Sequence, residues 1–196
     1  MFDEVVLESE FFDGLRRMDA EIAEHVRRGR CPRCGGALHR GDYGRKPRGG
    51  TLAAAGEEQT RRFSFCCSQE GCRRRATPPS LRFLGRRVYV EAVVVVASIV
   101  AMAKTRPREV RQSTGVPART VWRWRAWWSG AFAATAVLAE LRARFVGGLP
   151  ASLLPIVIVE KIEGCPSTRL EVVARWLAPL TTASLDDGAR FLKAMN

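Results

Sequence analysis

The stretch CPRCGG at Cys31–Gly36 is the strongest local signal in the sequence, and the expected fold is built around it. Two cysteines separated by two residues and followed by glycine are typical of a tight turn, called a knuckle, whose two sulfurs reach one tetrahedral ion. The stretch FCCSQEGC at Phe65–Cys72 supplies candidates for the other two ligands. We therefore expect a structural zinc ion (Zn2+) held by four cysteines, with no open position for water.

The second stretch contains three cysteines, of which a four-cysteine site needs only two. We favour Cys67 because Phe63 and Phe65 would share the side of an alternating strand that leads to it. Cys66 would then face away, but the sequence leaves both adjacent cysteines open as the third ligand. The expected zinc ligands are Cys31, Cys34, Cys67 and Cys72.

The cysteines and one histidine also allow other assignments. A redox CxxC normally begins a helix after a strand, and no such pattern precedes Cys31. His39 could replace a cysteine, although nothing in its spacing requires this. Cys165 stands alone, and we predict that it is a buried small residue.

The charge of the chain is strongly basic and unevenly distributed. Its formal net charge is +12, which draws it toward polyanions such as nucleic acid or an anionic membrane surface. Residues 1–26 contain eight acidic and two basic residues, whereas residues 61–125 contain fifteen basic and three acidic ones. This asymmetry predicts that a DNA contact lies in the basic middle of the chain.

A central segment has the spacing of a helix-turn-helix unit. An apolar helix over Val88–Met102 is followed by a short helix over Pro107–Ser113. A turn at Gly115 then leads to a third helix that runs from Pro117 through Trp128. This order of elements is typical of proteins that place their last helix in the major groove of DNA.

The third helix separates an apolar face from a basic one. Val121, Trp124 and Trp128 recur at helical spacing and are expected to face inward, and Val116 is expected to fill the core beside them. Arginines on the other face could meet phosphates or the O6/N7 edge of guanine. Three arginines directly after the last cysteine of the second stretch could clamp a run of phosphates. The predicted DNA-binding residues are Arg73, Arg74, Arg75, Arg119, Thr120, Arg123 and Arg125.

The segment before the first knuckle and the one between the knuckles differ in their periodicity. Ser9–Arg28 has Phe12, Leu15 and Ile22 on one face at helical spacing. We expect an amphipathic helix that packs on the rest of the chain or on a second copy. Gly41–Glu58 has no periodicity and is expected to be a mobile loop.

The tail has weaker signals. Ile156–Val159 is a β-branched run that predicts one edge strand. A helix is expected over about Arg169–Leu177, with Thr168 and Glu171 spaced as a capping box. Ala183–Asn196 is expected to fray.

Together these elements predict a mainly α-helical protein with a small β zinc ribbon and a helix-turn-helix three-helix unit. The chain is expected to divide into four segments. These are an acidic amphipathic helix at 1–29, a zinc ribbon with a long basic loop at 30–80, a helix-turn-helix bundle at 81–146 and a C-terminal helical tail at 147–196.

The order CPxCGG from Cys31, FSFCC from Phe63 and GCRRR from Gly71, followed by the predicted helices, resembles a known family. It is similar to the zinc-ribbon front end of bacterial insertion-sequence transposases and their accessory proteins, over about residues 30 to 130. The resemblance implies zinc held by the four predicted cysteines, and recognition of element ends or an operator by the third helix. The chain departs from the pattern in its three-cysteine second cluster and its long loop between the knuckles.

The leading hypothesis is a non-catalytic, sequence-specific protein that binds double-stranded DNA as an accessory or regulatory factor of transposition. One alternative is an adaptor that recruits a transposase, or a remnant of a transposase. Another is a nuclease, although acidic residues such as Glu160 and Asp186 show no arrangement on strands that would hold two metal ions.

The sequence also carries an expectation about cellular location. The acidic segment Met1–Glu10 lacks the pattern of a secretory signal, and the apolar run Val88–Ala103 is too short for a membrane span. We therefore expect a bacterial cytoplasmic protein, associated with the nucleoid and not with a membrane. Such a protein could act as a homodimer.

Overall fold

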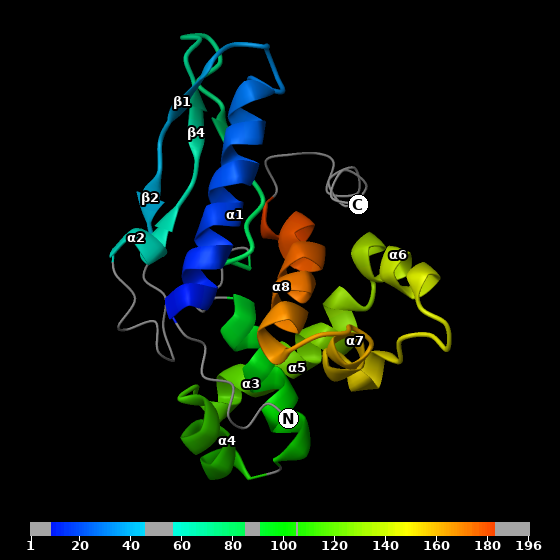
Figure 1. The fold of residues 1–196 in the computed structure, drawn as a ribbon. Coiled ribbons are helices and arrows are strands. Elements are labelled where there is room, and N and C mark those ends of the chain that lie inside the picture. Colours follow the sequence, from blue (N-terminus) through cyan, green and yellow to red (C-terminus); the bar gives the residue numbers. More distant parts are fainter. Residues whose placement is uncertain (1–8, 46–56, 85–90, 105, 183–196) are drawn as a thin grey trace.

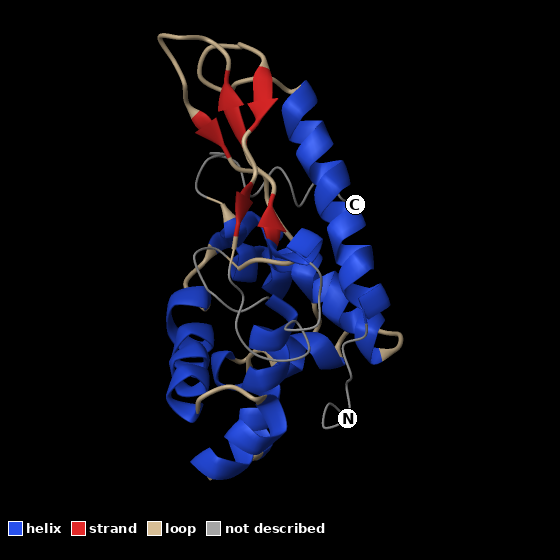
Figure 2. Cartoon of the chain, turned by 90° about the vertical axis from the view of Figure 1, so that its left-hand side faces the viewer, coloured by secondary structure: helices blue, strands red, loops and turns tan. Residues whose placement is uncertain are grey.

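The computed structural model describes residues 9–45, 57–84, 91–104 and 106–182 (Figure 1). In these ranges the chain is mainly helical and carries two small antiparallel sheets. Two views related by a quarter turn place the strands at one end of the molecule and most of the helices at the other (Figures 1 and 2). The cysteines and the basic helices therefore occupy different ends of the fold.

Helix α1 (Ser9–Arg28) has the predicted bounds and joins the two ends. Phe12, Leu15 and Ile22 are buried, as their spacing predicts. Phe12 packs in the main helical core, whereas Ala23, farther along the helix, packs with the residues around the cysteines. The helix therefore packs on the rest of its own chain, beside strands β1 and β4 (Figure 1).

The strands form a three-stranded sheet in the order β1-β4-β5 and a separate pair β2-β3. In the larger sheet, Leu38 lies opposite Cys67, and Cys66 lies opposite Arg75. All neighbouring strands are antiparallel. The elements are β1 (Leu38–Arg40), β2 (Tyr43–Gly44), α2 (Glu57–Thr60), β3 (Arg61–Arg62), β4 (Phe65–Cys67) and β5 (Arg75–Ala76).

The prediction of a loop over Gly41–Glu58 is wrong at both ends. Tyr43–Gly44 is a strand, and a one-turn helix begins at Glu57. Both elements are too short to show a period, and Tyr43 becomes a strand only because it pairs with Arg62 from a distant part of the chain. Residues 46–56 of this range lie outside the described residues.

Three consecutive helices follow, and each contacts the other two. They are α3 (Glu91–Ala103), α4 (Pro107–Thr114) and α5 (Ala118–Trp127). Gly115 makes the turn between α4 and α5 with a left-handed φ of 65°, and its N–H donates to the carbonyl of Arg111 at 2.9 Å. Residues 88–90 of the predicted first helix lie outside the described residues. Among the described helices, none combines the length and apolarity that a membrane crossing requires.

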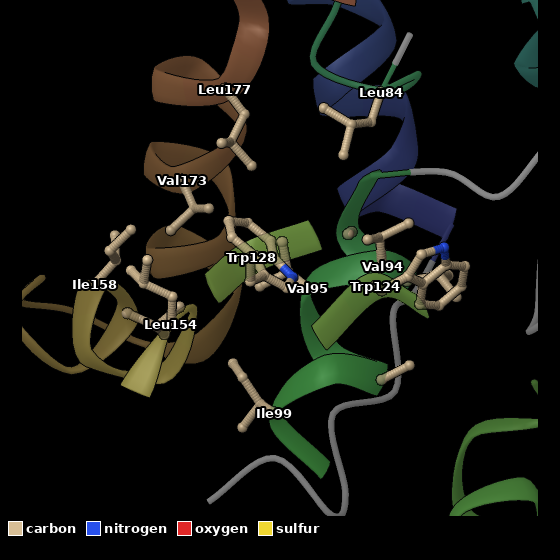
Figure 3. Close-up of a cluster of buried hydrophobic side chains, with 14 of the residues drawn as sticks. Leu84, Val94, Val95, Ile99, Trp124, Trp128, Leu154, Ile158, Val173 and Leu177 are labelled. Carbon is tan, nitrogen blue, oxygen red and sulfur yellow. The ribbon is translucent and has the colours of Figure 1, made fainter. Parts of the chain in front are cut away.

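The inward face of α5 agrees with the prediction. Val116, Val121 and Trp128 are fully buried, and Trp124 is almost so. Trp128 lies between Val95 of α3 and the helix that carries Val173 (Figure 3). Its indole N–H donates to the Ser98 hydroxyl at 3.1 Å, so the polar atom of this buried ring is satisfied.

The tail differs from its prediction in two places. Ile156–Val159 belongs to α7 (Ile156–Glu160) and is not a strand, because Ile158 and Val159 bury themselves together as one helical turn. Helix α8 begins at Pro166 and runs to Leu177, so Thr168 lies inside the helix and makes no capping box. Glu171 instead accepts hydrogen bonds from Arg175. Residues 183–196 lie outside the described residues.

A buried ion pair fastens α1 to the segment that precedes α3. Nε of Arg82 donates to a carboxylate oxygen of Asp19 at 2.9 Å, and the two side chains are 2% and 0% exposed. The Ser80 hydroxyl and the Leu81 N–H also donate to this carboxylate, each at 2.6 Å. Arg82 further donates to one backbone carbonyl in α2 and one in β3, each at 2.9 Å. The pair thus ties three parts of the chain together.

Candidate metal centre

Four cysteines from two distant stretches meet beside the larger sheet. The Sγ atoms of Cys31, Cys34, Cys67 and Cys72 all lie within 4.8 Å of one another. The Sγ atoms of Cys31 and Cys72 are 3.8 Å apart, and those of Cys34 and Cys67 are 3.4 Å apart. Four sulfurs bound tetrahedrally at a zinc–sulfur distance of about 2.3 Å would be about 3.8 Å apart. The four thiols could therefore hold one metal ion.

Both pairs of cysteines lie in tight backbone turns. In the first knuckle (Cys31–Gly36), the Gly35 N–H donates to the Cys31 carbonyl at 2.8 Å, and the Cys31 N–H donates to the Gly36 carbonyl at 2.9 Å. In the second knuckle (Cys67–Arg73), the N–H groups of Cys72 and Arg73 both donate to the Gln69 carbonyl at 3.0 Å. These turns hold each cysteine pair in place through local backbone bonds.

The backbone of the first knuckle also stabilises negative charge on sulfur. The Arg33 amide donates to the Cys31 sulfur, and this bond is the main cause that lowers the pKa of the Cys31 thiol to about 6. The Cys34 amide and the side chains of Cys34 and Cys72 add to the effect, whereas burial opposes it. Amides that point at thiolates are what a knuckle provides for a metal ligand.

At Cys67 the effects that raise the pKa of the thiol outweigh the one that lowers it. The Gln69 amide lowers the pKa of the Cys67 thiol, but burial and the three neighbouring cysteine sulfurs outweigh it and raise the pKa to about 12. Like charges on adjacent sulfurs repel one another, so a second thiolate is costly without a cation. A metal ion that binds here would release protons as it converts the thiols to thiolates.

The backbone at Gly36 packs so closely against the sulfurs that no side chain fits there without a shift. A Cβ atom there would lie 3.0 Å from the Cys67 sulfur and 2.6 Å from the Gln69 Cγ. A methyl group at this position would displace one of these atoms and distort the cluster. This role had not been predicted, although the second glycine of CPRCGG was its sequence signal.

Cys66 and His39 lie outside the sulfur cluster. They face each other across β1 and β4, and His39 is exposed. The Cys66 thiol donates to the Arg73 carbonyl at 3.4 Å. Alternation along β4 places Cys67 on the side of the buried Phe65 and turns Cys66 away from it. The sequence pattern favoured Cys67 because it predicted this alternation.

The three arginines of the second stretch have different surroundings. Arg73 and Arg74 are exposed. Arg75 donates from one guanidinium nitrogen to the Gly41 carbonyl at 3.2 Å and to the Ser64 hydroxyl at 3.1 Å. Its guanidinium also lies 5.6 Å from the centre of the Tyr43 ring. Arg75 therefore helps to hold the two sheets together.

The predicted DNA-binding residues of α5 also divide into two kinds. Arg119 and Arg123 are exposed one turn apart, and Arg123 lies 3.4 Å from the hydroxyl of the half-buried Thr120. Arg125 instead donates to the Ala101 carbonyl at 3.2 Å and stacks over the Trp122 ring at 5.3 Å. The outward face of α5 is therefore formed by Arg119 and Arg123, while Arg125 is held against α3.

Cys165 is exposed, so the prediction that it is buried is wrong. Pro166 begins α8, which leaves Cys165 just outside the helix at its solvent-facing start. The hydroxyls of Ser167 and Thr168 both lie 3.1 Å from its sulfur. Their hydrogen bonds, that of Ser167 first, lower the pKa of the Cys165 thiol to about 6.

Alkylation of Cys165 by iodoacetamide is expected to follow a titration midpoint near pH 6, because the thiolate is the reactive form. At pH 7 about 90% of this thiol would be ionised, against about 3% of a cysteine with an ordinary pKa of about 8.5. Labelling followed by peptide mass spectrometry measures the midpoint. Replacing Ser167 and Thr168 with alanine should move it upward, and a wild-type midpoint near 8.5 would contradict the prediction.

Comparison of the chain with protein-family models, curated proteins and solved structures finds no match. In the described ranges, the four cysteines are the only group of three or more histidine, cysteine or acidic side chains close enough to hold an ion. Glu160 is exposed at the end of α7, and Asp186 lies outside the described residues.

Proposed function

We propose that Cys31, Cys34, Cys67 and Cys72 hold one structural zinc ion in a zinc ribbon. The sulfur spacing, the two knuckles and the amides directed at the sulfurs support this assignment. Thiolates are soft ligands, and a tetrahedral set of four is typical of zinc or of iron–sulfur centres. Four protein ligands leave no position for a reacting water, so the ion would cross-link the fold and not catalyse a reaction.

We further propose that α4 and α5 act as a helix-turn-helix unit that binds duplex DNA through α5. The observation that carries the proposal is the division of α5 into two faces. Val121 and Trp124 are buried and fix the helix on α3, while Arg119 and Arg123 face solvent one turn apart. An anchored helix with arginines on its outer face can place their planar guanidinium groups against phosphates or guanine edges.

Other exposed arginines near α5 support the same function. Arg108 and Arg111 lie on α4, and both are exposed. In helix-turn-helix proteins the first helix of the pair crosses the DNA backbone, where arginines neutralise phosphates. With the order of knuckles and helices in the sequence, this arrangement supports a DNA-binding accessory or regulatory factor of a mobile element.

Duplex binding by fluorescence anisotropy across a salt series tests the proposal. The variant Arg119→Ala/Arg123→Ala is expected to lose about tenfold or more in affinity, and the slope of log affinity against log salt should fall by about 2. Arg17→Ala/Arg142→Ala is a matched control, because both residues are exposed on other helices. Wild-type affinity that does not respond to salt, or an equal loss in the control, would overturn the proposal.

A further inference from the structure

Two arginines beside the metal centre adopt an unusual backbone conformation. Among the described residues other than glycine, only Arg30 and Arg73 have a positive φ, of 61° and 44°. Residues with a side chain rarely adopt this left-handed conformation, which glycine reaches freely. Arg30 directly precedes Cys31, and Arg73 directly follows Cys72. Arginine at both of these strained positions is the observation that motivates a functional role for the two side chains.

Arg30, Arg33, Arg73 and Arg74 are all exposed, and each lies within two residues of one of the four cysteines in the sequence. Within the described part of the chain, none of these four guanidinium groups forms an ion pair or a hydrogen bond with another residue. The arginines at the end of α1 differ, because Arg27 and Arg28 both pair with Glu24. The four arginines, which we call the arginine tip, thus concentrate positive charge beside the four cysteines, against one exposed acidic residue of the second knuckle, Glu70.

The arginine tip lies far from the proposed DNA-binding helix. The views in Figures 1 and 2 place the loops beyond β1 and β4 at one end of the molecule and α4 at the other. Helix α1 has 20 residues, which corresponds to a length of about 30 Å. It ends two residues before Arg30, and near its start Phe12 packs in the same core as Trp124 of α5. The length of α1 is thus close to one turn of B-form DNA, about 34 Å.

We propose that the arginine tip, formed by Arg30, Arg33, Arg73 and Arg74, is a second contact to the DNA backbone, about one helical turn from α5 on the same duplex. The proposal rests on the proposed function of α5 and adds to it the length of DNA that is recognised. Helix α1 would hold the two contacts at a fixed separation, because Phe12 packs in the helical core and Ala23 packs in the cluster around the cysteines. The zinc ion would then have a functional role in shaping the tip, beyond stabilising the fold.

The double variant Arg30→Gly/Arg73→Gly tests this inference without threatening the fold. Glycine fits a positive φ better than arginine does, so zinc content and thermal stability should be equal to or above those of the wild type. Affinity should be compared on duplexes of about 8 and about 24 base pairs, because the shorter one is only about 27 Å long and cannot reach both contacts. Arg17→Ala/Arg142→Ala again serves as the control with the same change in charge.

The expected result is a loss that depends on duplex length. On the longer duplex the glycine variant should bind about tenfold more weakly at low salt, with a salt slope smaller by about 2. On the shorter duplex its affinity should equal that of the wild type. Equal affinity on the longer duplex, an equal loss on both duplexes, or capture of a second labelled duplex by the wild-type complex would overturn the inference. If the wild type binds neither duplex, the proposed function of α5 fails as well.

Discussion

Replacing Asp19 with alanine is expected to destabilise the protein by about 3–5 kcal/mol, because it leaves the buried charge of Arg82 without its partner. Arg82 is 2% exposed, and its guanidinium cannot turn to water without breaking its hydrogen bond to the Arg61 carbonyl in β3. The Ser80 hydroxyl and the Leu81 N–H would lose their acceptor at the same time. Urea unfolding followed by circular dichroism measures the change in the free energy of unfolding.

Glu24 lies on the same helix as Asp19 and provides a control. Its replacement removes a charge from an exposed ion pair and not from a buried one. Glu24 also pairs with arginines, but its pairs with Arg27 and Arg28 are exposed, so Glu24→Ala should have little effect on stability. The double variant Asp19→Leu/Arg82→Met removes both buried charges and should recover part of the loss, since an apolar pair can replace a buried ion pair. An Asp19→Ala variant as stable as Glu24→Ala would contradict this account.

Replacing Cys67 with serine is expected to abolish tight zinc binding. Loss of groups that merely support metal ligands weakens binding by about 10–100-fold, and loss of a ligand should exceed that range. Cys67 is fully buried among Phe65, Leu38 and the other sulfurs, so no water-exposed group can take its place. Metal analysis after dialysis against a weak chelator measures the loss.

The Cys67→Ser variant should lose the structure around the knuckles, while the helical core should stay folded. The apolar cluster around the cysteines is separate from the cluster that α3, α5 and α8 build around Trp128. Far-ultraviolet circular dichroism should therefore keep most of its helical signal, while Cys31 and Cys34 become reactive toward alkylating agents. Cys66→Ser is the matched control and should keep its zinc, because the Cys66 thiol bonds to the Arg73 carbonyl outside the cluster. Zinc loss in Cys66→Ser but not in Cys67→Ser would reverse the assignment.

Several elements could be predicted from neighbouring residues alone. The spacing of Phe12, Leu15 and Ile22 predicted the bounds of α1, and Gly115 predicted the turn between α4 and α5. Alternation along Phe63–Cys67 indicated which of two adjacent cysteines joins the cluster. In each case the deciding interactions lie within one turn of helix or a few residues of strand, so a local pattern describes them.

The predictions that the structure contradicts depend on how an element packs against distant parts of the chain. Ile156–Val159 has the composition of a strand but forms a helical turn, because burial of Ile158 and Val159 against the helical core outweighs β propensity. A lone cysteine is usually buried, yet Cys165 is exposed because the start of α8 faces solvent in the folded chain. Neither outcome follows from the residues nearby, since each depends on how an element meets the rest of the fold.

Residues close together in the chain specify the two knuckles, the amphipathic first helix and the apolar face of α5, so each could be predicted from a local pattern. The folded structure places Asp19 against Arg82, 63 residues away, and buries both side chains. In the same structure Arg75 and Arg125 are held by backbone carbonyls, while Arg30 and Arg73 take left-handed backbones and project from the knuckles. Which distant groups surround a charged side chain, and how much water they exclude, determine its electrostatic role. Neither can be predicted from the residues next to it in the sequence.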